Sequence, residues 1–114
     1  MTTNEKRDNI IQIIDDMKAE RIAVLDVHQK TSVADYFIVC SGNSDVHINA
    51  IASKLEDKLR DLKVKPLRTE SKGGGWVLID YGDIILHVMK EEQRQFYDLE
   101  TLWESIHQNP DLEP

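Results

Sequence analysis

The fold of this 114-residue chain is decided by residues 76–89, WVLIDYGDIILHVM, two apolar runs of strand length on either side of Gly82 and Asp83. A Gly-Asp pair between two such runs is typical of a tight two-residue hairpin. With that loop, Tyr81 pairs with Ile84, and every step outward adds one further pair. The further pairs are Asp80 with Ile85, Ile79 with Leu86, Leu78 with His87, Val77 with Val88 and Trp76 with Met89.

Alternation along the two strands sorts these residues into two faces. The first face is apolar enough to be the floor of a core and carries Val77, Ile79, Tyr81, Ile84, Leu86 and Val88. The second, which we name the candidate docking face, carries Trp76, Leu78, Asp80, Ile85, His87 and Met89. Because it sets a carboxylate and an imidazole among apolar side chains, it suggests a protein-docking surface. The alternative is that helices cover both faces and that Asp80 and His87 are satisfied internally.

Helical periodicity and capping signals predict three helices around this hairpin. The first spans residues 4–20 behind a capping box of Thr2 and Glu5, and the second follows the N-cap Ser44. The third runs from about residue 91 to residue 106. Their inward stripes are Ile10, Ile13, Ile14 and Met17; Ile48, Ile51, Ala52, Leu55, Leu59 and Leu62; and Phe96, Leu99, Leu102, Trp103 and Ile106.

Three more strands precede the hairpin: residues 22–27, a doubly buried strand at 36–40, and a short edge strand at 67–70. The order is therefore α-β-β-α-β-β-β-α, an α/β (α+β) fold with one mixed five-stranded sheet and three helices. We expect a single domain over residues 1–106 and a disordered tail over residues 107–114, which contain two prolines and no helical stripe.

Charge and composition narrow the classes of function. The net charge is −7, and residues 91–114 hold 7 acidic residues against the single base Arg94. This balance disfavours primary nucleic-acid binding and favours a basic partner protein. Cys40, the only cysteine, lies in an apolar run and should be a buried thiol. Neither a signal-peptide core nor an apolar run of about 18 residues is present, so we expect a cytoplasmic protein without membrane contact.

Several groups resemble chemical sites only superficially. Residues 42–44 lie between a strand and a helix N-terminus, where phosphate can bind. A helix cap explains the same residues, and because the phosphate-loop frame is missing we favour the cap. Residues 73–75 fit a flexible linker. Asp80 and Asp83 do not converge on one metal ion, and we expect His47 at the surface. The sequence predicts no catalytic residues, no metal site and no cofactor.

The middle of the chain is its most basic part, but its bases alternate with acids. The bases are Lys54, Lys58, Arg60, Lys63, Lys65 and Arg68, interleaved with Glu56, Asp57 and Asp61. A solvated helix face explains this pattern better than an RNA-binding stripe does, and glancing contact with RNA stays open.

A set of motifs, in order over residues 4–105, strongly resembles the ribosomal silencing factor family, also called iojap-like. The motifs are LDV at 25–27, DYFIVCSG at 35–42, His47 with AIA at 50–52, WVLIDYGD at 76–83, HV at 87–88 and YDLETLW at 97–103. One departure is the loop at 71–75, where the family varies in length, which affects loop contacts only.

The resemblance implies a partner and a function. Members of the family bind the large ribosomal subunit through ribosomal protein L-fourteen, block joining of the small subunit and repress translation in starved or stationary cells. Their fold is similar to that of nucleotidyltransferases, which need a close carboxylate pair after the Gly-Ser turn. Only Asp45 follows that turn here, so we expect no enzyme, and a nucleotide-binding or nucleotidyltransferase enzyme is the alternative.

The resemblance also implies which residues contact the partner. It carries partner binding over to Trp76, Leu78, Asp80 and His87, whereas Ile85 and Met89 are added from the hairpin register alone. Whether the protein forms a homodimer stays open.

Overall fold

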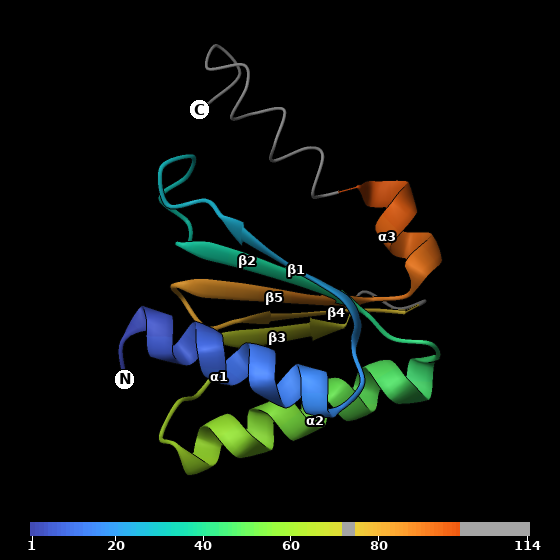
Figure 1. Cartoon of the computed structure of the whole chain (residues 1–114), viewed down its shortest axis with the longest axis horizontal. Helices are drawn as coiled ribbons and strands as arrows, with labels where there is room; N and C mark the ends of the chain where they lie inside the picture. The colour runs from blue at the N-terminus through green and yellow to red at the C-terminus, as the bar shows by residue number, and fades with distance from the viewer. Residues whose placement is uncertain (72–74, 99–114) are drawn as a thin grey trace.

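The computed structural model describes residues 1–71 and 75–98, and its elements follow the predicted order (Figure 1). They are α1 (Thr3–Asp16), β1 (Glu20–Asp26), β2 (Tyr36–Ser41), α2 (Asp45–Asp61), β3 (Arg68–Ser71), β4 (Trp76–Asp80), β5 (Ile84–Met89) and α3 (Glu91–Tyr97). The five strands form one mixed sheet in the order β1-β2-β5-β4-β3. The pair β2–β5 is parallel and the other three pairs are antiparallel.

The hairpin has the predicted register at every pair, from Asp80 opposite Ile85 to Trp76 opposite Met89. Tyr81 closes the loop by donating its backbone N–H to the carbonyl oxygen of Ile84 at 2.9 Å. Gly82 has a φ of +92°, a left-handed conformation that glycine adopts without a steric cost. The two-residue loop therefore has the geometry that its residue types favour.

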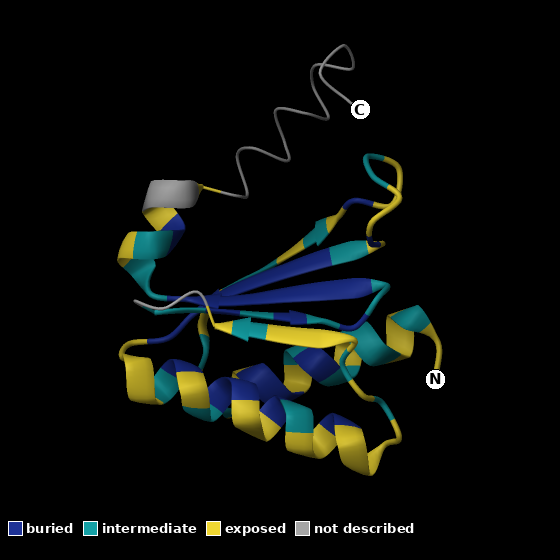
Figure 2. Ribbon diagram, turned by 180° about the vertical axis from the view of Figure 1, so that it is seen from behind, coloured by how far each residue is buried: buried dark blue, intermediate teal, exposed yellow. Residues whose placement is uncertain are grey.

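The apolar face of the hairpin is the floor of the main core, as predicted. All six of its residues are buried and pack with Ile38 and Cys40 of β2 against α1 and α2. Figure 2 shows the inner sides of both helices buried against the sheet. Burial raises the pKa of the Cys40 thiol to about 12, so this side chain behaves as a small apolar core residue.

Both long helices begin where the sequence predicted, and each ends in a way that corrects one expectation. Thr2 and Glu5 form the capping box of α1, and the Ser44 hydroxyl accepts the His47 N–H of α2. The first helix ends at Asp16 rather than at residue 20, because Lys18 turns the chain with a φ of +63°. The predicted core residue Leu62 is 45% exposed, since it is the C-cap of α2 and lies one position beyond the end of the helix.

His47 is not the surface residue that the sequence suggested. Its ring is half-buried between the two helices, where Nε2 lies 2.8 Å from the carbonyl oxygen of Met17 and Nδ1 accepts the Asn43 N–H at 3.0 Å. With Nδ1 accepting, Nε2 carries the proton that the Met17 carbonyl accepts. His47 thus joins the end of α1 to the start of α2.

The third helix ends at Tyr97, where Asp98 adopts a left-handed conformation with a φ of +46°. The inward positions predicted beyond it, Leu99, Leu102, Trp103 and Ile106, lie outside the described residues, as do the side chain of Phe96 and the predicted tail at 107–114. None of the described helices has the length and apolar character that crossing a membrane requires.

Candidate docking face

The candidate docking face continues from the hairpin across β2, because the parallel pairing of β2 with β5 aligns three rows of side chains. Each row joins one residue from each of the three strands β2, β5 and β4. The rows are Phe37, Ile85 and Asp80; Val39, His87 and Leu78; and Ser41, Met89 and Trp76. The structure therefore brings all six predicted residues onto one side of the sheet. The helices α1 and α2 cover the other side (Figure 1).

Burial divides the six residues into two levels. Ile85, His87 and Met89 of the interior strand β5 are buried, with 5%, 7% and 0% of their surface exposed. Trp76, Leu78 and Asp80 of β4 are only half-buried. The residues of β5 thus form a floor, and those of β4 form the part of the face that an approaching molecule can touch.

One end of the face is covered by the connection between β1 and β2. Val27 and Ala34 of this connection are buried against Phe37 and Ile85, with Leu25 and Leu78 packed at the edge of the cluster. This small second core holds the floor of the face in place, so the face is formed before any partner binds.

The carboxylate of Asp80 is satisfied within the chain. Its Oδ1 accepts the backbone N–H of Gly82 at 2.8 Å, and its Oδ2 lies 3.4 Å from Nε of Arg68 on the edge strand β3. Arg68 also donates to Glu70 at 3.0 Å. Since Arg68 pairs with Asp80 across the strands, and Glu70 with Leu78, these residues give the apolar face a charged margin.

The imidazole of His87 is the second polar group of the face, and it too has partners. Trp76 donates its indole Nε1–H to Nδ1 of His87 at 3.1 Å, and the two ring centroids are 5.8 Å apart. Phe37 packs against the same imidazole in a T-shaped arrangement, with ring centroids 5.9 Å apart and an angle of 67° between the ring planes. Internal satisfaction of Asp80 and His87, which the alternative interpretation required, is therefore present alongside the accessible side chains of β4.

A second polar cluster lies where α3 meets the end of the sheet. Arg94, which is 5% exposed, donates to the hydroxyl of Ser41 at 3.1 Å, and Ser41 donates to Glu91 at 3.0 Å. Arg21 of β1 forms an ion pair with the same Glu91. These contacts fasten α3 to the sheet, and three of the residues, Arg21, Ser41 and Glu91, line a cavity of about 370 Å³ beside residues 42–43.

The turn at residues 42–44 uses its backbone N–H groups internally. Gly42 donates to the carbonyl oxygen of Met89 at 3.0 Å, and Asn43 donates to Nδ1 of His47. Asp45, the carboxylate that follows the turn, is paired with Lys90 at 3.1 Å. A helix cap therefore explains this turn, and the amides of Gly42 and Asn43 are already used within the chain.

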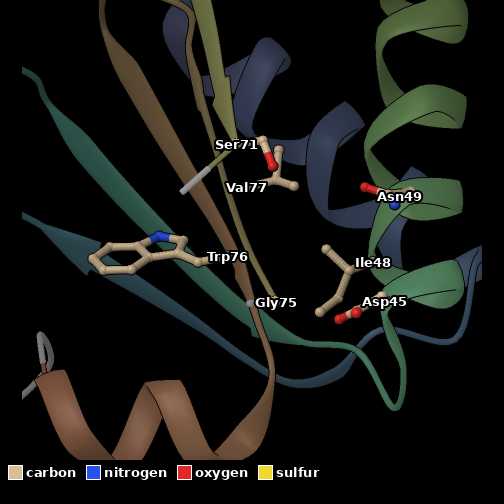
Figure 3. Close-up of a pocket in the computed structure, with 7 residues that line it drawn as sticks. All are labelled: Asp45, Ile48, Asn49, Ser71, Gly75, Trp76 and Val77. Atoms are coloured by element: carbon tan, nitrogen blue, oxygen red, sulfur yellow. The ribbon is translucent and has the colours of Figure 1, made fainter. Parts of the chain in front are cut away.

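Figure 3 shows a smaller cavity of about 140 Å³ between the start of α2 and β4. Its polar side chains are Asp45, Asn49 and Ser71, and the indole of Trp76 points away from it.

Within residues 1–71 and 75–98 there is no group of three or more His, Cys, Asp or Glu side chains that could hold a metal ion. Asp83, considered for a metal pair, instead accepts hydrogen bonds from Thr3 and Lys6.

Sequence reasoning missed the contribution of β2, the charged margin on β3 and the buried Arg94. The sequence predicted a doubly buried strand at residues 36–40, but nothing in the sequence showed that this strand pairs in parallel with β5. The signal for the margin was present, because Arg68 and Glu70 lie two residues apart on a predicted edge strand.

Comparison with known proteins finds relatives over most of this chain. The profile of a family described as "Ribosomal silencing factor during starvation" matches residues 1–114. A Bacillus subtilis protein named ribosomal silencing factor RsfS is 40% identical over 90 residues, which are 78% of this chain and 76% of that protein. A crystal structure of a Chromobacterium violaceum protein has a TM-score of 0.87 at 34% identity and covers 91% of this chain and 88% of that one.

A mouse protein named mitochondrial assembly of ribosomal large subunit protein 1 is a more distant relative. It is 30% identical over 100 residues, which are 84% of this chain and 44% of the mouse protein. The match thus spans less than half of the mouse protein.

Proposed function

This chain belongs to the ribosomal silencing factor family, and from that premise we propose that it silences the large ribosomal subunit by docking onto ribosomal protein L-fourteen. Bound there, it blocks joining of the small subunit in the cytoplasm and lowers translation in starved or stationary cells. The name of the mouse relative, which refers to the ribosomal large subunit, supports the choice of subunit.

The observation that carries the proposal is the half-buried pair Trp76 and Leu78 on a preformed sheet face. Both side chains stand on β4, on the side of the sheet opposite α1 and α2, above the buried floor formed by β5. Large, rigid aromatic and aliphatic side chains at the centre of a surface with a polar margin are typical anchors of protein interfaces. A steric blocker needs such a surface and no chemistry.

The charge of the protein supports a basic protein as its partner. The chain carries a net charge of −7, and opposite charges on two partners accelerate their encounter in a salt-dependent way. The exposed bases of α2 are accompanied by acids, as in the pair of Arg60 with Asp57 at 3.2 Å. Contact with ribosomal RNA is therefore at most an addition to the protein contact.

The experiment is co-sedimentation of the purified protein with isolated large and small ribosomal subunits. We expect it to pellet with the large subunit alone, and less completely as salt is raised. Trp76→Ala and Leu78→Ala should each weaken the free energy of binding to the large subunit by about 2 kcal/mol, as expected for central interface residues. Less of each variant should therefore pellet. The matched control is Val46→Ala, which shortens a 79% exposed side chain on α2 and should pellet like the unaltered protein. Equal pelleting with both subunits would contradict the proposal.

A nucleotidyltransferase is the competing function, and calorimetric titration with ATP and Mg²⁺ tests it directly. The turn amides at 42–43 and the carboxylate of Asp45 already have partners within the chain, so we expect no heat of binding. A saturable signal in that titration would favour the enzyme.

A further inference from the structure

We propose that His87 acts in docking as a positioning residue that holds the indole of Trp76 in its binding orientation, rather than as a residue that touches the partner. The inference rests on the proposed function, because it concerns the same face and the same partner. It separates His87 from Trp76, although both were predicted to be contact residues.

His87 is much less accessible to a partner than Trp76 is. Only 7% of this residue is exposed, whereas Trp76 beside it is half-buried. A partner that approaches the face therefore meets the indole and not the imidazole. Any effect of His87 on binding has to pass through a neighbour that the partner can reach.

A hydrogen bond between the two side chains fixes the direction of the indole. Trp76 Nε1 donates to His87 Nδ1 at 3.1 Å, and indole has no other polar atom with which to be oriented. The bond runs diagonally between strands, since the register places Met89 opposite Trp76 and Leu78 opposite His87. It therefore draws the indole over β5, across the docking face.

The imidazole of His87 is in turn held in place by packing against Phe37. Phe37 packs edge-on against the imidazole, and Phe37 is itself held by Val27 and Ala34 in the small second core. The three rings come from β4, β5 and β2, so the orientation of an accessible tryptophan depends on a buried contact two strands away. Limiting the rotation of an anchor side chain before binding reduces the entropy that docking has to overcome.

The test compares substitutions at both ends of the hydrogen bond. His87→Leu removes the acceptor, His87→Asn keeps an acceptor in the place of Nδ1, and Trp76→Phe keeps an aromatic ring but removes the donor. We expect His87→Leu and Trp76→Phe each to weaken large-subunit binding by about three- to ten-fold, the cost of ordering one side chain on docking. His87→Asn should restore much of the loss.

The double variant Trp76→Phe with His87→Leu distinguishes positioning from direct contact. If His87 acts through the indole N–H, its substitution should have no further effect on binding once Trp76 is phenylalanine. A combined loss equal to the product of the two single losses would overturn the proposal. So would unchanged binding in Trp76→Phe, which reports on the same bond even where His87→Leu fails to fold.

A spectroscopic readout on the free protein accompanies the binding data. The chain has two tryptophans, so a Trp103→Phe background leaves Trp76 as the single indole. There His87→Leu should lower the fluorescence anisotropy of Trp76 and shift its emission, while His87→Asn should not. If Trp76→Ala leaves pelleting unchanged, the proposal that this face binds the large subunit is wrong. If Trp76→Ala weakens pelleting but His87→Leu changes neither binding nor fluorescence, only the positioning role fails.

Discussion

Lys6 donates its Nζ to the Oδ1 of Asp83 at 2.8 Å, joining the first turns of α1 to the loop of the hairpin across 77 positions of sequence. Thr3 donates its hydroxyl to the other oxygen of the same carboxylate at 2.6 Å. The backbone oxygen of Asp83 accepts the N–H groups of Asp35 and Tyr36. The hairpin loop thus fastens the N-terminal helix and the start of β2 at one end of the sheet.

We predict that Asp83→Asn destabilises the protein in a pH-dependent way. Partial burial raises the pKa of Asp83, but the hydrogen bonds from Lys6 and Thr3 outweigh it and leave the pKa below its ordinary value. A depressed folded-state pKa stabilises the protein above the unfolded-state pKa, and this contribution is lost as pH falls through the folded-state value. The variant should lose about 1–2 kcal/mol at pH 7 and progressively less below about pH 4. Thermal melts between pH 7 and pH 2 measure the difference.

The matched control is Asp15→Asn, which removes one exposed carboxylate from the same helix as Lys6. It should show a small and nearly constant difference from the unaltered protein over the same pH range. A constant deficit of Asp83→Asn down to pH 2 would show that the charge of this carboxylate is not what matters.

The two faces of the hairpin should respond differently to substitution. Ile79→Asp or Leu86→Asp places a charge at a fully buried core position and should cost several kcal/mol, enough to unfold a domain whose whole stability is about 5–15 kcal/mol. Trp76→Ala and Leu78→Ala should lower the melting temperature far less, since both residues are only half-buried. Thermal melts of the four variants measure whether the two faces contribute differently to stability. Unfolding by Trp76→Ala as severe as that by Ile79→Asp would make this face part of the core.

Alanine substitutions at Gly82 and Gly42 should both lower the stability of the protein, for different reasons. A Cβ at Gly82 would meet only Leu67 Cδ1 at 3.5 Å, so Gly82→Ala tests its φ of +92° alone and should cost about 1–2 kcal/mol. A Cβ at Gly42 would lie 2.6 Å from Cγ1 of the buried Ile48, so Gly42→Ala should cost about 1–3 kcal/mol by overpacking. Urea denaturation measures both costs.

Asparagine distinguishes the two causes, because it tolerates positive φ better than alanine does. Gly82→Asn should be more stable than Gly82→Ala, whereas Gly42→Asn should be less stable than Gly42→Ala. The same order of stability at both positions would refute the assignment of backbone strain to one and packing to the other.

Tyr81→Phe should leave the protein as stable as before or stabilise it by up to about 1 kcal/mol. Among the described residues, no hydrogen-bond partner meets its buried hydroxyl, and burial raises the pKa of this phenol above its ordinary value. Removing an unsatisfied buried hydroxyl relieves a desolvation cost. The contrast is Tyr36→Phe, where the lost hydroxyl accepts from Arg7 at 3.0 Å, so we expect a small loss. Chemical denaturation of both variants tests this, and a marked loss for Tyr81→Phe would contradict it.

The sequence by itself determined the features that depend on neighbouring residues. The pair Gly82-Asp83 and the alternation on either side of it specified the hairpin register, because a slip by one residue would exchange the two faces. Thr2 with Glu5 and the N-cap Ser44 likewise specified where two helices begin, since their side chains bond to amides only three residues away. Five strands, three helices and the members of each hairpin face follow from such local rules.

Only the tertiary structure decided how distant segments meet. The parallel pairing of β2 with β5 sets Phe37 beside Ile85 and Val39 beside His87, and no local periodicity specifies which strands become neighbours. The same is true of the Lys6–Asp83 bond and of the burial that separates His87 from Trp76. These features arise because the chain buries its apolar faces as a whole, and burial depends on which elements pack together rather than on the residues that flank each position. The hairpin alone therefore predicted a docking face, and the assembled sheet divided that face into an accessible strand and a buried floor.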